Sequence, residues 1–113
     1  MKARLTPSAD RDVANILSDT KKLFGAQQVS KYAAVIDHGL ELLCENPLRA
    51  SSKAHDEYGA EIRSFPLRLA SGKTAGASHV IYYLPVEDEV LVLRILAESM
   101  LPKWRIAKAL KQN

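Results

Sequence analysis

Arg94 is the residue whose type and setting most directly suggest chemistry. It lies inside the apolar run 90–96, where a permanently charged guanidinium needs either a partner or a solvated groove. The partner could be an acid of the helices predicted below, which would make Arg94 structural. Alternatively, Arg94 lines a groove and binds an RNA phosphate or a carboxylate of a partner protein. The sequence alone leaves both interpretations open.

Two further side chains could line the same groove. His79 and Tyr83 recur with a period of two in the segment 78–84, so they share one face of a predicted strand, although a half-buried sheet surface also accounts for them. The three histidines are spread over a helix, a loop and a strand, and none pairs with a second ligand at metal spacing. Cys44 is expected to be a small core residue. We therefore expect neither a metal nor another cofactor.

The C-terminal tail is basic. Residues 103–113 contain four cations and no acid, and residues 62–86 also contain cations and no acid. This pattern indicates an anionic partner, either nucleic acid or an acidic protein surface, although a solvated basic face would have the same composition. Trp104 lies between Lys103 and Arg105 and could anchor a partner there. The alternative, which the sequence slightly favours, is a tryptophan folded back on the core.

Length and composition indicate a single domain, residues 1–113. The chain has 113 residues, 47% hydrophobic and 26% charged, with a formal net charge of +3. No apolar run approaches the roughly 20 residues that a membrane span needs. The first seven residues lack the apolar stretch of a secretory signal. We therefore expect a cytoplasmic protein without a membrane partner.

The first half of the chain predicts a short strand and two helices. Residues 3–5 could form an edge strand. Thr6 and Pro7 are typical of a helix start, and Gly25 of a helix end, with the apolar stripe Val13, Ile16, Leu17 and Phe24 between them. A second helix begins near residue 26 and ends at Asn46-Pro47. The two helices should form an antiparallel hairpin facing one core.

The second half of the chain changes to strand periodicity. A loop over 47–60 precedes alternating residues over 61–70, where Pro66 favours an edge or a bulge. A flexible turn over 71–76, a strand over 78–84, a hairpin connection over 85–89, a strand over 90–96 covered on both faces and a short basic helix from Pro102 complete the order. The fold class is therefore α+β, with an N-terminal strand and a two-helix hairpin packed on a small antiparallel sheet.

Several short stretches in this order resemble one family. They are Leu5-Thr6-Pro7, Leu23-Phe24-Gly25, Asn46-Pro47, Ile62-Arg63-Ser64-Phe65-Pro66, Ser78-His79-Val80-Ile81-Tyr82-Tyr83, and Val92-Leu93-Arg94-Ile95-Leu96 followed by Met100. Over nearly its whole length the chain resembles the RelE/ParE toxins of bacterial type II toxin–antitoxin systems, and most closely the ParE branch.

The resemblance implies a toxin that a cognate antitoxin holds inactive by wrapping a flexible segment around its helices and sheet. ParE-like members bind and poison DNA gyrase without recognised catalytic residues, and they reach operator DNA only through the antitoxin. RelE-like members are metal-independent, ribosome-dependent endoribonucleases that cut mRNA with a set of basic residues.

The basic set of the nucleases is incomplete in this sequence. Only Lys53 could stand for their lysine pair, and His79 stands where they carry an arginine. Trp104 stands where they carry a C-terminal proton-transfer group. The resemblance therefore favours a gyrase-binding toxin without catalytic residues. The candidate partner-binding residues are Arg63, His79, Tyr83, Arg94, Lys103, Trp104 and Arg105.

Two alternatives stay open. One is a RelE-like mRNA endoribonuclease whose groove contains Arg63, His79 and Arg94, with Lys53 near it. The other is an inactive toxin that only helps its antitoxin to bind operator DNA.

Overall fold

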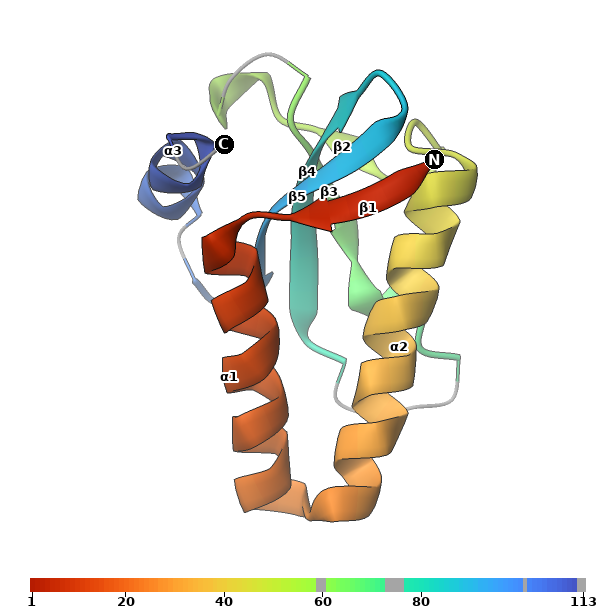
Figure 1. The fold of residues 1–113 in the computed structure, drawn as a ribbon, viewed down its shortest axis with the longest axis vertical. Helices are drawn as coiled ribbons and strands as arrows, with labels where there is room; N and C mark the ends of the chain where they lie inside the picture. Colours follow the sequence, from red (N-terminus) through yellow and green to blue (C-terminus); the bar gives the residue numbers. More distant parts are fainter. Residues whose placement is uncertain (59–60, 73–76, 101, 112–113) are drawn as a thin grey trace.

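One mixed five-stranded sheet carries helices on both of its faces (Figure 1). The computed structural model describes residues 1–58, 61–72, 77–100 and 102–111. The strand order across the sheet is β1-β5-β4-β3-β2. The elements are β1 (Lys2–Leu5), α1 (Pro7–Phe24), α2 (Ala26–Glu45), β2 (Lys53–Ala54), η1 (Asp56–Tyr58), β3 (Arg63–Pro66), η2 (Leu67–Leu69), β4 (His79–Val86), β5 (Glu89–Ala97) and α3 (Lys103–Leu110), where η denotes a 3-10 turn.

The helical hairpin forms as its terminal residues predict. The Thr6 hydroxyl accepts a hydrogen bond from the Ala9 N–H, and Pro7 occupies the first turn, where no N–H is needed. Gly25 joins the two helices at φ +89, a conformation that favours glycine. Phe24 is the exception to the predicted apolar stripe. It is 70% exposed because it lies at the tip of the hairpin, which projects beyond the sheet (Figure 1).

Thr6 also joins the helix to the sheet. Its hydroxyl donates to the Leu93 carbonyl at 2.8 Å, and Thr6 is buried. Replacing Thr6 by valine keeps the shape and removes both hydroxyl bonds, so we expect a loss of about 1–2 kcal/mol in the free energy of unfolding in urea. Thr20→Val is the matched control. The Thr20 hydroxyl bonds only within α1, to the Ile16 carbonyl, so an equal loss in both variants would contradict this role for Thr6.

The sheet is mixed, whereas the sequence predicted an antiparallel one. β3, β4 and β5 are antiparallel as expected, but the edge strand β1 pairs with β5 in parallel, with Lys2 opposite Glu89 and Leu5 opposite Val92. Strands joined in parallel need a long crossover connection, and the hairpin and the strands that follow it lie between β1 and β5 in the chain. Composition and periodicity carry no information on this direction.

Two further expectations for the sheet are corrected. The strand predicted over 61–70 is confined to β3, because Pro66 cannot donate to the ladder and the chain then turns through η2, where Leu67 is fully buried. The predicted loop over 47–60 contains β2 and η1, which are too short for periodicity to detect. Most of the predicted turn over 71–76 lies outside the described residues.

Each face of the sheet has its own core. Residues of β5 contribute to both cores, and Val90 to Leu93 are fully buried, which confirms the prediction of a strand covered on both sides. The core against the hairpin includes Ile16, Tyr32, Ile36, Leu43, Phe65, Ile81, Tyr83, Val92 and Ile95. The core against α3 includes Ile62, Tyr82, Leu91, Leu93, Leu96, Ile106 and Ala109.

Candidate functional site

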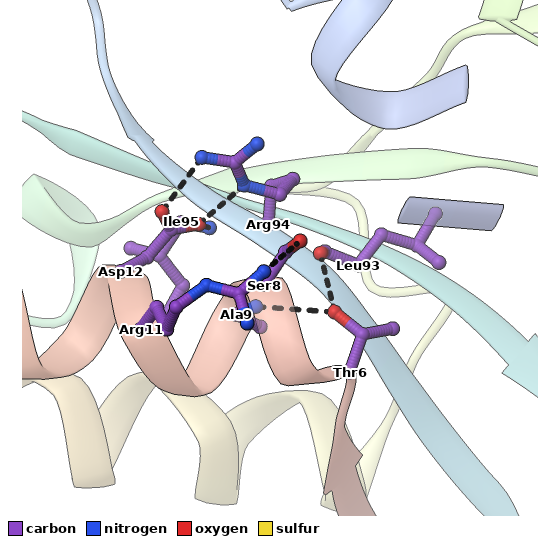
Figure 2. A network of polar contacts seen from close by, with 8 residues as sticks. All are labelled: Thr6, Ser8, Ala9, Arg11, Asp12, Leu93, Arg94 and Ile95. Carbon is purple, nitrogen blue, oxygen red and sulfur yellow. Dashed lines mark hydrogen bonds and ion pairs between the residues drawn. The ribbon is translucent and has the colours of Figure 1, made fainter. Parts of the chain in front are cut away.

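Arg94 forms an ion pair with an acid of the helical hairpin. Its Nε and Nη2 atoms donate to the two carboxylate oxygens of Asp12 at 2.6 and 2.7 Å, and the Ile95 N–H donates to the same carboxylate at 2.9 Å (Figure 2). The two side chains are only 17% and 11% exposed. The structural interpretation of Arg94 is therefore confirmed, because its guanidinium binds the Asp12 carboxylate in a bidentate pair inside the molecule.

The end of β1 explains why this pair forms. β1 ends at Leu5, and α1 continues alongside β5, where the Thr6 N–H bonds the Val92 carbonyl and Asp12 accepts from Ile95. The Asp12 carboxylate thereby accepts the hydrogen bond of a β5 backbone N–H group that a neighbouring strand would otherwise accept. A bulge accompanies this change, because the partners of Tyr82 and Tyr83 on β5 are Arg94 and Val92, which leaves Leu93 without an opposing residue.

His79 lines a cleft between the two hairpin helices and the start of β4. Its Nδ1 atom is 2.6 Å from the Tyr32 hydroxyl, and the cleft has a volume of about 570 Å³. Burial lowers the pKa of His79 and raises the pKa of Tyr32 to about 12. The cleft is lined by Ile16, Asp19, Thr20, Leu23, Phe24, Gln28, Tyr32, Ser78 and His79.

The lowered pKa of His79 predicts a loss of stability in mild acid. Neutral His79 contributes to the stability of the fold. This contribution is fully present above pH 6.5, the pKa of histidine in the unfolded chain, and is lost as the pH falls from there through the lower pKa of the folded state, because the unfolded chain binds the proton first. Burial outweighs the nearby charges of Asp12, Asp19 and Glu98, which raise the pKa. A fall in pH from 7.5 to 5.5 should therefore lower the thermal unfolding temperature of the wild type more than that of His79→Gln. An equal change of unfolding temperature with pH in the two proteins would refute this.

Tyr83 is a core residue, which corrects its prediction as a partner-binding residue. Its side chain is fully buried and its hydroxyl donates to the Pro47 carbonyl, which ties β4 to the end of the hairpin. Tyr83 shares the hairpin face of β4 with His79, as predicted, but the helices cover this face. The buried Tyr83 ring is therefore not accessible to a binding partner.

The residues proposed for a nuclease groove do not converge. Arg63 lies opposite Tyr83, four residues along β4 from His79, which is roughly 13 Å at strand spacing. Its guanidinium is held by the Ser52 hydroxyl, and that of Arg94 is neutralised by Asp12. Lys53 lies on β2, the last strand of the sheet. The expected grouping of Arg63, His79 and Arg94 in one groove is therefore corrected.

The C-terminal helix presents Trp104 to solvent. The ring is 77% exposed, and the Lys103 ammonium lies 5.7 Å from its centroid. The favoured prediction, a tryptophan folded back on the core, is wrong. Ile106 and Ala109 are the fully buried residues of α3 in the core on this face of the sheet. Trp104, two positions before Ile106, lies about 200° around the helix from it. Arg105 is half-buried.

Sequence reasoning missed a hydrogen-bonded chain on the α3 side of the sheet. His55 places its Nε2 atom 2.6 Å from the Ser64 hydroxyl and its Nδ1 atom 2.9 Å from the Glu57 carboxylate, and its ring stacks on Tyr58. Hydrogen bonding from His55 lowers the pKa of Glu57. The chain holds η1 against β3. No signal pointed to it, since three of its four residues lie in a segment without periodicity.

Among the residues that the structure describes, no group of three or more His, Cys, Asp or Glu side chains could hold a metal ion. No described helix is long and apolar enough to cross a bilayer.

Comparison of structures identifies the fold class. The solved structure of the chromosomal ParDE toxin–antitoxin system from P. aeruginosa superposes with a TM-score of 0.68 over 86% of this chain and 95% of the other, at 16% sequence identity. The α+β fold is therefore of the RelE/ParE type, as the sequence predicted.

Comparison of sequences then identifies the family. The model of the family described as the ParE toxin of the type II toxin–antitoxin system parDE matches residues 3–102. Toxin ParE of Escherichia coli is 32% identical over 111 residues, which span 95% of this chain and 94% of the relative. The chain belongs to the ParE toxin family and is a ParE-type toxin of a type II toxin–antitoxin system.

Proposed function

We propose that this toxin acts in the cytoplasm by binding DNA gyrase and blocking its function, with α3 as the docking surface. The observation that carries the proposal is the exposed Trp104 beside Lys103 on a helix without acidic residues. An exposed aromatic ring next to a cation gives a partner apolar area, a stacking surface and charge in one place. The basic helix fits an acidic patch on the target.

Binding rather than catalysis fits the remaining candidate residues. The guanidinium of Arg94 is bound to a carboxylate, and His79 is half-buried with its Nδ1 atom on Tyr32. A metal-free ribonuclease needs its basic groups aimed at one phosphate. The separation of Arg63, His79 and Arg94 argues against that mechanism.

Neutralisation by a cognate antitoxin is part of the same proposal. The net charge of +3 and the acid-free tail favour an acidic segment that becomes ordered on binding. The two outer strands of the sheet, β1 and β2, each leave an edge to which such a segment could add. The toxin would then reach operator DNA only through the antitoxin.

Pulse-labelling of cells after induction of the toxin alone tests the proposed target. An early fall in DNA synthesis with translation intact is expected, together with inhibition of supercoiling by purified gyrase. An early fall in translation would replace this proposal with a ribosome-dependent nuclease. No effect on either would favour an inactive toxin.

Co-expression with the neighbouring reading frame should restore growth and yield a stable complex, and a toxin that purifies alone and is harmless would contradict the antitoxin proposal.

A further inference from the structure

Two arginines at one end of the sheet carry charges without a carboxylate partner. Three other arginines are paired with carboxylates: Arg4 with Glu89 at 2.7 Å, Arg68 with Glu98 at 3.2 Å, and Arg94 with Asp12 at 2.6 Å. Within the described part of the chain, no carboxylate lies within ion-pair distance of Arg49 or Arg63. The bonds of these two go to hydroxyl and carbonyl groups instead.

One hydrogen-bonded network holds both guanidiniums in place. Arg63 donates from Nε and Nη2 to the Ser52 hydroxyl oxygen at 2.9 and 2.7 Å, and the Ser52 hydroxyl donates to the Arg49 carbonyl at 2.7 Å. Arg49 donates from Nη1 to the Leu42 carbonyl in the last turn of α2 and from Nε to the Ser51 hydroxyl. Both side chains are therefore positioned while their positive charges are not neutralised.

Each guanidinium also keeps donors available. A guanidinium has five N–H donors, and these contacts leave one terminal nitrogen of each arginine unused. Both residues are half-buried, and Arg49 lies 6.0 Å from the centroid of the Phe65 ring. Partial burial strengthens a bond to an incoming anion, and pre-positioning lowers the entropy lost on binding.

We infer that Arg49 and Arg63 form a carboxylate-binding site for an acidic, partly apolar peptide segment that runs along the β2 edge of the sheet. Leu48, next to Arg49, is 65% exposed and offers apolar contact, which favours a peptide over a nucleic acid. β2 is the last strand of the sheet, so its outer edge can pair with an extended segment. The cognate antitoxin supplies this segment, and in that respect the inference rests on the proposed function.

Fluorescence anisotropy with a synthetic probe tests the site without gyrase or antitoxin. The probe is a labelled ten-residue peptide of alternating leucine and glutamate, titrated with the full-length toxin. We expect Arg63→Gln and Arg49→Gln each to weaken binding about tenfold or more, because each removes a charge-assisted hydrogen bond. Arg68→Gln is the matched control, since it removes the same charge from an arginine already paired with Glu98. Its effect should stay within about twofold.

Two outcomes would overturn the inference. Equal weakening by Arg68→Gln and Arg63→Gln would mean that only net charge matters. Tighter, Arg63-dependent binding of a ten-nucleotide single-stranded DNA would assign the site to phosphate instead of a peptide. Arg63→Lys separates binding from folding, because it keeps the charge and loses the forked geometry. It should bind with intermediate affinity and unfold at the same temperature as Arg63→Gln.

Failure of this site and failure of the proposed target give different results. Trp104→Ala should bind the probe as the wild type does even where it no longer inhibits supercoiling, because Trp104 lies on α3 and Arg63 on β3. If Arg63→Gln binds the probe normally but no longer inhibits gyrase, the site is refuted and Arg63 joins the target surface. With the co-expressed antitoxin, Arg63→Gln should weaken neutralisation to the same degree as probe binding.

Discussion

Replacing Trp104 by alanine should weaken gyrase inhibition strongly and leave the fold intact. The ring is 77% exposed, so its removal costs little folding energy, whereas aromatic anchors of interfaces carry a large share of binding energy. We expect a loss of about 2 kcal/mol or more in binding, or about 30-fold in Kd. Surface plasmon resonance with immobilised gyrase, together with thermal unfolding, measures both quantities.

Phe24→Ala is the matched control for Trp104→Ala. Phe24 is a similarly exposed aromatic residue, 70% accessible, but it lies at the hairpin tip, at the opposite end of the molecule from α3 (Figure 1). Gyrase binding should not change in this variant. Full inhibition by Trp104→Ala would remove α3 from the proposed function, and a loss in Phe24→Ala alone would place the target at the hairpin cleft.

Replacing Asp12 by alanine should destabilise the fold severely, by more than the loss expected for Thr6→Val. The change leaves the Arg94 guanidinium without its carboxylate and the Ile95 N–H without its acceptor, in a site where both partners are nearly buried. Breaking a buried pair from one side costs about 3–5 kcal/mol. Since small domains are stable by about 5–15 kcal/mol, a substantial unfolded fraction is expected. Urea unfolding followed by circular dichroism measures the loss.

Two further variants isolate the pair from helix effects. Asp10→Ala removes an exposed acid from the first turn of the same helix and should cost only about 0.5 kcal/mol, from the lost interaction with the helix dipole. Adding Arg94→Met to Asp12→Ala removes the unpaired charge and should recover part of the loss. A double variant as unstable as the sum of the two single variants would show that Asp12 and Arg94 do not act as a pair.

The local elements followed from the sequence because their signals are local. The start of α1 depends on Thr6 and Pro7, and the junction of the two helices on Gly25, all within one helical turn of the groups they satisfy. The alternating faces of β4 follow from its period of two, which separates Ile81 and Tyr83 from Val80 and Tyr82. The family resemblance agreed with the element order read from these signals and added the toxin–antitoxin assignment.

Long-range contacts were decided only by the tertiary structure. The sequence could state that Arg94 needs a partner but not which one, because Asp12 is 82 positions away and reaches Arg94 only after α1 replaces β1 beside β5. The sequence gives no reason to single out Arg49, because its importance lies in having no carboxylate partner among the described residues, which only the structure shows. Trp104 and Tyr83 exchanged their expected places, Trp104 at the surface and Tyr83 in the core. Periodicity places a side chain on a face, but only the packing of other elements against that face determines whether it is covered.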